Sequence, residues 1–480
     1  MAAVIVGGSI SGLASALVLA DLGHEVQILE RDRGVPPETV EEAHRHWPRP
    51  TVPQATHSHA FASLGCNLPR TRAPSVYRAL IDAGATEIRL GESMPPSLSD
   101  RSPEPGDDDL LMLACRRSTF EWALRREVLR LPQVRVEPGA VVRSLEFGNG
   151  DGRRVVGART QDGRTFTADL VIDACGRRSA ATRWLSEAGI PVAEDQVGAC
   201  EITYYTRFYR LLADQPPGPL NRGFGAGGLW DHYTAVLFLG DNRTFSISIG
   251  VLPDDPEMKL LRSEPAFTAA LRATPLLAPW LSPGASVPIS GVHAMGGLDN
   301  CLRGVATSKQ SPAITGLYHV GDSVCTTNPA YGRGISLAFA HAYQLGDVLS
   351  SYPDVGNEQA REVAHATERL FSPWVAEAVQ NDRGRAMLWK STINGTSLPP
   401  MPPGMVTFGS VVAAAATDPV VWRRVARVMM MLAPPTALYA DEEIRGRVAQ
   451  AFAAGAPPQI PAPSREELVS VVTSAADLVA

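Results

Sequence analysis

The sequence predicts an α/β fold in which a parallel-sheet domain is interleaved with an antiparallel-sheet domain and followed by a helical C-terminal region. Three features predict it. Residues 4–30 are patterned as strand, glycine-rich turn, helix and strand; residues 200–294 alternate apolar and polar positions; and the chain from residue 357 onward is mainly helical. Because 480 residues are too many for one ordinary core, we expect two or three domains.

The order of these patterns predicts the domain boundaries. We expect residues 1–195 to form the first part of the parallel-sheet domain and 196–300 the antiparallel sheet. Residues 301–356 return to the first domain, and 357–480 form the helical region.

Shorter patterns predict the individual elements. After a Pro-rich, acidic stretch at 35–53, we expect helices near 75–85 and at 118–130. The expected strands are 134–137, 141–147, 155–161 and 165–168 as a meander, then 169–173, 200–210, 233–239, 244–251, 285–294 and 317–320. Pro-rich breaks are expected at 399–403 and 455–463.

The turn at residues 7–12 reads GGSISG, which is the pattern G-x-G-x-x-G with Ser9 in the middle glycine position. The glycines of this pattern allow a tight turn, a close approach to a pyrophosphate and close packing of helix on strand. Ser9 is small enough for that approach, and the helix that follows offers free N–H groups to phosphates. Glu30 ends the second strand, where an acidic side chain accepts hydrogen bonds from ribose hydroxyls. Because an acid there disfavours a 2′-phosphate, the Rossmann-like unit fits FAD or NAD better than NADP.

The residues predicted to bind the cofactor in this unit are Gly7, Gly8, Ser9, Ile10, Ser11, Gly12, Glu30 and Arg31. The alternative is a glycine turn without a ligand. A second match to the pattern, at Gly223, Gly225 and Gly228, follows no expected strand and lacks a well-placed acid. We interpret it as a flexible loop.

Composition excludes several classes of protein. The net charge of −6 argues against a nucleic-acid partner, which usually requires a basic excess. Six cysteines without a C-x-x-C pair indicate a reduced, cytoplasmic protein. The apolar start lacks a basic segment and is broken by glycines, unlike a signal peptide, and no later run reaches the roughly 18 apolar residues of a membrane span.

A second motif lies at residues 319–323 (HVGDS) and 328–334 (NPAYGRG), followed by a helix. It resembles the second FAD fingerprint of the group A flavoprotein monooxygenases, which share the para-hydroxybenzoate hydroxylase fold. The resemblance implies that Asp322 contacts the ribityl chain, that Gly321 beside it also binds the cofactor, and that a loop with Pro329 and Gly332 borders the isoalloxazine ring. It also implies that the helix beginning at Gly334 and Ile335 points its N-terminus at the pyrimidine end of the flavin. The alternative is a surface turn capped by Asp322.

Two further segments resemble the same family. Arg117 precedes a helix, as does the family's flavin-contacting arginine. Residues 169–179, with Arg183 after them, resemble the mid-chain motif linked to FAD and to transient NAD(P)H use, but Cys175-Gly176 stands where the hydroxylases usually have Asp-Gly. Within the family, residues 52–59 and 202–207 look most like the epoxidases of polyether-ionophore biosynthesis.

The resemblance implies an FAD-dependent monooxygenase that is reduced by NADPH or NADH. Oxygen from O2, carried as a flavin C4a-hydroperoxide, is inserted into an alkene or electron-rich ring of a lipophilic secondary metabolite. Pro329 and Gly332 are the candidate catalytic positions because they border the flavin ring, and no acid or base residue is identified. The alternatives are a reductase of the geranylgeranyl-reductase type and a non-catalytic FAD-binding protein. A halogenase is disfavoured because the W-x-W-x-I-P stretch is absent.

Two remaining patterns have competing interpretations. His57 and His59 face the same side of an extended segment, but no third ligand accompanies them, so we expect hydrogen bonding and no metal. Residues 420–432 are basic and apolar at helical spacing. We expect this helix to pack on its own protein as core or lid; the alternative is contact with a membrane surface. The sequence does not indicate an oligomeric state.

Overall fold

The computed structural model describes residues 1–480 except 96, 150–152, 312, 399–404, 456–459 and 478–480. A parallel five-stranded sheet has the order β18-β9-β1-β2-β5. Its strands are β1 (Ala2–Val6), β2 (Glu25–Glu30), β5 (Val134–Pro138), β9 (Leu170–Asp173) and β18 (Leu317–His319). The α/β fold class predicted from the sequence is therefore confirmed.

The opening unit is formed as predicted, with α1 (Ile10–Asp21) between β1 and β2. β1 pairs with β2 on one side and with β9 on the other, so the strand order reverses at β1. In open parallel sheets, ligands bind at such a switch point, beyond the carboxyl ends of the strands. The turn at residues 7–12 lies at this position.

One part of the predicted meander is wrong. β5 joins the parallel sheet beside β2, and only β6 (Val142–Phe147), β7 (Val155–Thr160) and β8 (Thr165–Thr167) form the antiparallel meander. The segment 134–138 is too short for its apolar pattern to distinguish a parallel from an antiparallel partner.

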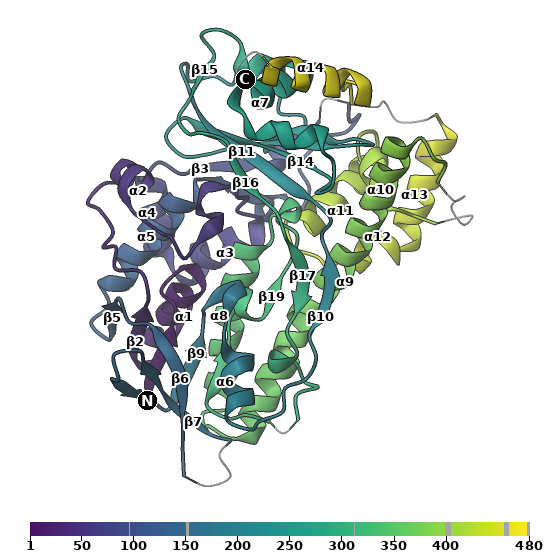
Figure 1. Ribbon diagram of the computed structural model, residues 1–480. Coiled ribbons are helices and arrows are strands. Elements are labelled where there is room, and N and C mark those ends of the chain that lie inside the picture. The colour runs from purple at the N-terminus through teal and green to yellow at the C-terminus, as the bar shows by residue number, and fades with distance from the viewer. Residues whose placement is uncertain (96, 150–152, 312, 399–404, 456–459, 478–480) are drawn as a thin grey trace.

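A second, six-stranded antiparallel sheet has the order β12-β13-β14-β11-β15, with β16 also paired to β11. Its strands are β11 (Thr203–Leu211), β12 (Gly225–Leu229), β13 (Thr234–Leu239), β14 (Thr244–Val251), β15 (Ser286–Pro288) and β16 (His293–Met295). Helices α7 (Glu264–Ala273) and α14 (Arg465–Asp477) pack together beside it (Figure 1). The N-terminus lies in the parallel-sheet part, and α14, the last described helix, lies at the opposite end.

Residues 223–228 do not form the flexible loop that we expected. Gly225 to Leu229 are strand β12, paired along its length with β13. A Cβ at Gly225 would lie 2.1 Å from the Leu237 carbonyl oxygen, and one at Gly227 would lie 2.0 Å from the Ala235 carbonyl oxygen. The glycines allow close approach of backbones in this sheet, a use that the sequence pattern does not distinguish from a loop.

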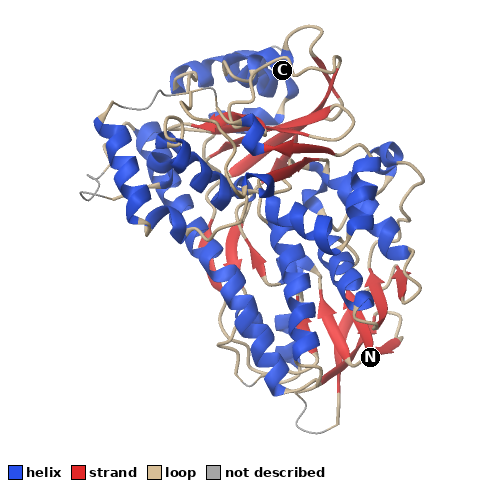
Figure 2. Ribbon diagram, turned by 180° about the vertical axis from the view of Figure 1, so that it is seen from behind, coloured by secondary structure: helices blue, strands red, loops and turns tan. Residues whose placement is uncertain are grey.

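The remaining helices cover the parallel sheet and bridge to the antiparallel one. They are α2 (Val40–His46), α3 (Ser63–Arg72), α4 (Pro74–Asp82), α5 (Arg117–Leu129), α6 (Ala181–Glu187), α8 (Gly334–Ser351) and α9 (Asn357–Asn394). The view from behind shows α9 as the long helix that runs from the parallel sheet up to the antiparallel one (Figure 2). Two shorter sheets contain β3 (Thr86–Arg89) with β4 (Leu111–Ala114), and β10 (Gln196–Ala199) with β17 (Asp299–Leu302) and β19 (Cys325–Thr326).

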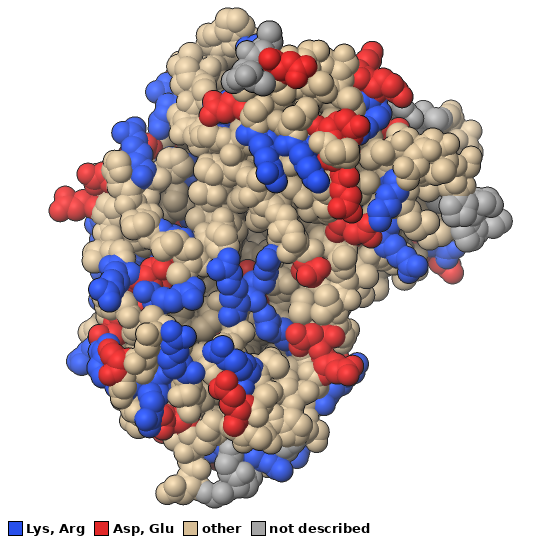
Figure 3. Space-filling view, viewed as in Figure 1, with Lys and Arg blue, Asp and Glu red and all other residues tan. Residues whose placement is uncertain are grey.

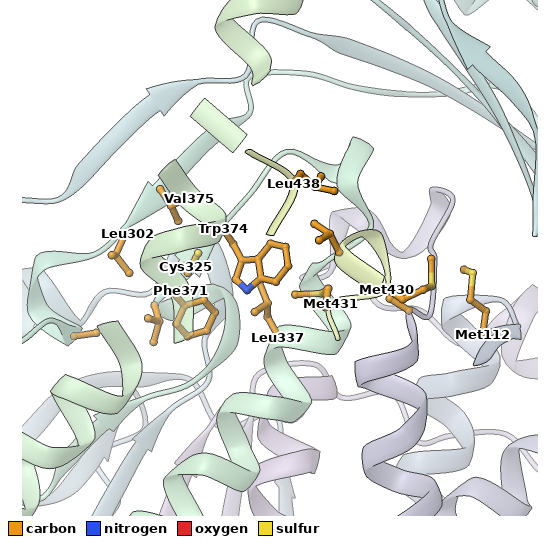
Figure 4. Packing of buried hydrophobic residues seen from close by; sticks show 14 of the residues in the cluster. Met112, Leu302, Cys325, Leu337, Phe371, Trp374, Val375, Met430, Met431 and Leu438 are labelled. Carbon is orange, nitrogen blue, oxygen red and sulfur yellow. The ribbon is translucent and has the colours of Figure 1, made fainter. Parts of the chain in front are cut away.

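The C-terminal helices pack on the rest of the chain through one apolar cluster. They are α10 (Phe408–Ala414), α11 (Pro419–Met429), α12 (Thr436–Tyr439) and α13 (Glu442–Ala453). In Figure 4, Trp374 of α9 lies beside Leu337 of α8 and Met431, and Met430 faces Met112 of β4. Val421 and Val428 of α11 are 0% and 1% exposed, which confirms that residues 420–432 pack on their own protein. The expected break at 399–403 lies outside the described residues, as do residues 456–459 of the break at 455–463, whose described residues belong to no helix or strand.

No described helix is long and apolar enough to cross a membrane. All six cysteines are free thiols.

Candidate FAD site

The turn between β1 and α1 has no room for side chains at two of its glycines. Gly7 has a φ of +107°, a conformation that favours glycine. A Cβ at Gly12 would lie 1.9 Å from the Gly7 carbonyl oxygen. Ser9 is the N-cap of α1, but its side chain does not cap the helix. The first N–H groups of α1 therefore remain free to bind an anion, as a pyrophosphate site requires.

Glu30 lies directly beside this turn. Its Oε2 accepts a hydrogen bond from the Gly8 N–H over 2.8 Å, and its Oε1 accepts one from the Asp32 N–H over 2.7 Å. The carboxylates of Glu30 and Asp32 also contact the Arg49 guanidinium, at 3.4 and 3.3 Å respectively. Glu30 is thus held at the predicted ribose position. Its neighbour Arg31 is exposed.

Arg117 joins the turn to helix α5. It donates to Ser9 Oγ over 2.9 Å and to Glu121 Oε2 over 2.6 Å. Glu121 also forms an ion pair with Arg49 at 2.7 Å. Burial alone would raise the pKa of Glu121, but Arg117 and Arg49 outweigh this and hold the pKa below its ordinary value. A buried network of charges therefore fixes the orientation of Arg117.

Sequence reasoning missed Arg49. This residue lies in the Pro-rich stretch at 35–53, which contains α2 and resembles no binding motif. Its guanidinium stacks on Trp47 at 5.3 Å and meets three carboxylates, those of Glu30, Asp32 and Glu121. An arginine between two prolines matches no motif for binding carboxylates. Its part in the site becomes visible only from its contacts in the folded protein.

The second motif meets the first at the carboxyl edge of the parallel sheet. A Cβ at Gly321 would lie 2.2 Å from Ser11 Oγ. Next to it, Asp322 lies close to Gly176 and to Gly334, whose added Cβ atoms would be 3.9 Å from Asp322 atoms. The structure thus brings together predicted site residues that are more than 300 positions apart in the sequence.

The Asp322 carboxylate accepts no hydrogen bond from any residue that the structure describes. Burial raises its pKa, and Arg117 and Arg177 only partly oppose this. Asp322 is partly buried. A carboxylate that loses hydration without gaining donors is costly, so a ligand that brings hydroxyl donors would fit this position. Ribityl hydroxyls supply such donors. The free N–H groups of α1, the crowded glycines and Asp322 together fit FAD.

The mid-chain motif lies beside the same edge. The buried Asp173 accepts hydrogen bonds from the Cys175 N–H over 3.0 Å and Ser179 Oγ over 2.5 Å, and its Oδ2 lies 2.9 Å from His319 Nδ1. Arg177 and Arg178 are exposed, and Arg183 pairs with Glu187. Figure 3, in the same view as Figure 1, shows Lys and Arg side chains gathered near the middle of the visible face of the molecule.

Loop 328–334 connects the second motif to α8. Residues Pro329–Tyr331 form a 3-10 turn, Gly332 has a φ of +64°, and α8 begins at Gly334. Pro329 and Gly334 are exposed, whereas Ile335 is 8% exposed. A Cβ at Gly332 would lie 2.8 Å from Ala60 Cβ, so the loop touches the segment that contains His57 and His59.

The segment with His57 and His59 binds the antiparallel sheet by hydrogen bonds. His57 Nδ1 lies 3.0 Å from Thr206 Oγ1, and Ser58 Oγ bonds Ser246 and Ser248 at 2.7 and 2.9 Å. Burial lowers the pKa of His57 to about 4. Among the described residues, no group of three or more His, Cys, Asp or Glu side chains is arranged to hold a metal.

One face of the antiparallel sheet looks toward this segment and is incompletely covered. On β13 and β14, Ala235, Leu237 and Ile247 are fully buried, whereas Val236, Phe238 and Ser248 on the opposite face are partly exposed. Phe238 also stacks on Phe224 at 6.1 Å. The sheet face that carries Ser248 and contacts the His57 segment is therefore partly apolar and partly exposed to solvent.

No protein-family model matches the chain. The chain is 26% identical over 452 residues to Protein Rv3254 of Mycobacterium tuberculosis, and the match covers 87% of each protein.

Solved flavoprotein structures resemble most of the chain at low sequence identity. A triple mutant of the flavin-dependent brominase Bmp2 aligns with a TM-score of 0.58 and 13% identity, over 94% of this chain and 98% of that one. PqsL from Pseudomonas aeruginosa, a probable FAD-dependent monooxygenase, aligns with a TM-score of 0.54 and 14% identity, over 82% and 96%. The chain has the fold of the FAD-dependent monooxygenases.

Proteins with this fold are named for different reactions, among them a brominase and a monooxygenase. A flavoprotein/dehydrogenase from Cytophaga hutchinsonii also aligns, with a TM-score of 0.59 and 11% identity, over 94% of this chain and 98% of that one. Identities this low establish the shared architecture alone.

Proposed function

We propose that this protein is an FAD-dependent monooxygenase that uses NADPH or NADH as reductant. The observation that carries the proposal is the meeting of the glycine-rich turn, Arg117 and the unpartnered Asp322 carboxylate at one edge of the parallel sheet. FAD bound there would supply the redox chemistry and the activation of O2. The chain's own residues would hold the cofactor, position the substrate and exclude water.

The substrate that we propose is a lipophilic small molecule with an alkene or an electron-rich ring, as in secondary metabolism. The partly open face of the antiparallel sheet, with Val236 and Phe238, offers an apolar surface. The segment with His57 and His59 lies against this face and also touches loop 328–334 through Ala60. Loop positions Pro329 and Gly332 are the candidate catalytic positions because they would border the flavin ring.

The histidines near this face support a substrate that needs no base. Burial lowers the pKa of His57 to about 4 and that of His59 to about 3. Imidazoles with such low pKa values are weak bases at neutral pH and would not efficiently deprotonate a phenol. Epoxidation of an alkene requires no general base, so we favour an epoxidase over a phenol hydroxylase.

A second candidate is a reductase of the geranylgeranyl-reductase type, which the similarity to the Cytophaga hutchinsonii flavoprotein/dehydrogenase favours. Such an enzyme would use FAD at the same site to reduce a double bond, without O2.

The test is cofactor content followed by oxygen stoichiometry. We expect the purified protein to contain FAD and to consume O2 when NADPH or NADH is added with a linear polyene alcohol such as geraniol. Reduction of the polyene under anaerobic conditions, without oxygen uptake in air, would favour the reductase. A protein that cannot be loaded with FAD would contradict both candidates.

A further inference from the structure

Asp382, in the interior of α9, lies at the centre of a buried hydrogen-bond network. Its side chain is 1% exposed. Its Oδ1 accepts hydrogen bonds from Asn328 Nδ2 over 2.7 Å and from the Tyr331 hydroxyl over 3.0 Å. Its Oδ2 accepts one from Asn300 Nδ2 over 2.7 Å, and Arg385 lies 3.3 Å from Oδ1. One carboxylate of the C-terminal region thus binds both loop 328–334 and strand β17.

Asn328, the first residue of that loop, uses its whole side chain in this network. Its Oδ1 accepts hydrogen bonds from the Tyr204 hydroxyl over 2.5 Å and from the Ala330 N–H over 3.0 Å. Its backbone N–H donates to Asn300 Oδ1 over 2.8 Å. Tyr204 belongs to β11, so the antiparallel sheet is tied to the same point.

The carboxylate at position 382 and the Ala330 N–H together fix which way the Asn328 amide faces. A carboxylate accepts hydrogen bonds and a backbone N–H donates one, so the NH2 group of Asn328 faces Asp382 and its oxygen faces Ala330 and Tyr204. An amide at position 382 would keep one oxygen and turn an NH2 group toward a second donor, so its contact with Asn300 or with Asn328 would be lost. Hydrophobic packing could fill the same volume but could not impose this orientation.

The two sides of loop 328–334 differ in how they are held. On one side, α9 contributes Asp382 and also Glu377, which pairs with Arg333. Arg333 also stacks on Trp374 of the same helix, at 4.6 Å. On the other side, Pro329 and Gly334 remain exposed. Helix α9 therefore holds one side of the loop. The other side is exposed, and a flat ring can lie against it.

We propose that Asp382 is a positioning residue that sets loop 328–334 against the isoalloxazine ring, acting through Asn328 and Tyr331. The inference rests on the proposed function, because the ring must lie on the open side of the loop. It assigns to the helical C-terminal region a role in the flavin site itself. Asp382 would not touch the flavin; it would control the distance and tilt between loop and ring.

The test compares Asp382→Asn with Asp347→Asn in the full chain loaded with FAD. Asp347 lies on α8, the helix that follows the loop, and pairs with Arg72 at the surface. Each protein is reduced with dithionite without oxygen and mixed with aerated buffer, and the return of flavin absorbance is followed. Visible circular dichroism of the bound FAD reports its environment independently, and thermal unfolding reports stability.

We expect Asp382→Asn to bind FAD yet to change the rate of reoxidation by about fivefold or more, as for the loss of about one net hydrogen bond. Its flavin dichroism should change as well. Asp347→Asn should match the wild type in both. Tyr331→Phe should give a smaller change, and the double variant should change the rate by less than the two single effects combined, because both substitutions act on one network.

Equal rates and equal dichroism in a folded, FAD-loaded Asp382→Asn protein would overturn this inference and leave the proposed function intact. A wild-type protein that binds no FAD would instead remove the proposed function. If Asp382→Asn does not fold, Tyr204→Phe tests the same network from its other end. We then expect a change in reoxidation rate and dichroism, and wild-type values would overturn the inference.

Discussion

Arg117 Nη2 donates a hydrogen bond to Ser9 Oγ over 2.9 Å and so ties the first turn of α5 to the turn before α1. The side chain is 5% exposed and is also paired with Glu121. A buried arginine with one shared carboxylate retains donors that a phosphate or flavin oxygen can accept.

Replacing Arg117 with Met should weaken FAD binding. Loss of a hydrogen bond to a charged group costs about 1.5–3 kcal/mol, so we expect the dissociation constant to rise at least about tenfold. Fluorescence titration of the apoprotein with FAD measures this. The control is Arg130→Met, which removes an exposed arginine just beyond the C-terminal end of the same helix. Equal affinity in the Arg117 and Arg130 variants would contradict the site.

Replacing Gly12 with Ala should abolish FAD binding. The new Cβ would lie 1.9 Å from the Gly7 carbonyl oxygen, so the turn would have to open and α1 would move away from β1. We expect a protein without bound flavin, detected by absorbance after purification. In the control Gly384→Ala, the new Cβ meets nothing within 4 Å in the interior of α9. This control should keep FAD and gain about 0.5–1 kcal/mol of stability. A yellow, fully loaded Gly12→Ala protein would refute the assignment of the turn.

The pH dependence of stability should include a contribution from His57. Burial lowers its pKa to about 4 in the folded protein, with a smaller contribution from His293, and the ordinary value is 6.5. Between these pH values the unfolded chain binds a proton that the folded protein does not. The free energy of unfolding should therefore fall as the pH drops from about 6.5 to about 4, by up to ~1.4 kcal/mol per pH unit.

The His57→Asn variant removes this titration and should flatten the pH dependence. Urea unfolding at pH 5 and pH 7, both with saturating FAD, measures the difference. His46→Asn is the control, because His46 is exposed in the folded protein as well and its replacement should leave the difference unchanged. If His57→Asn loses as much stability at pH 5 as the wild type, His57 is not held neutral by burial.

The parts of the fold predicted from the sequence are those in which local pattern and tertiary structure agree. The apolar strand 4–6, the crowded turn and Glu30 lie within 30 residues and impose one geometry on each other. The predictions for β12 and β5 were wrong because local pattern does not determine their structure. The structure of each strand depends on the strand with which it pairs, and the local sequence does not indicate which strand that is.

The candidate site divides in the same way. Glycines that need positive φ or close contact, and acids that end strands, follow from the backbone geometry and so appear in the sequence as motifs. Arg49 and Asp382 act through side chains that reach across the fold, from a Pro-rich stretch and from the middle of a long polar helix. Neither segment has a pattern that distinguishes these residues from an ordinary surface charge.

The most direct test of the proposed monooxygenase activity is the fate of isotopically labelled oxygen. The FAD-loaded protein is supplied with NADPH or NADH, 18O2 and a linear polyene alcohol such as geraniol, and the products are analysed by mass spectrometry. We predict one 18O atom in the product and one equivalent of nicotinamide oxidised for each product formed. A reduced polyene without label, formed equally well in the absence of oxygen, would contradict this prediction.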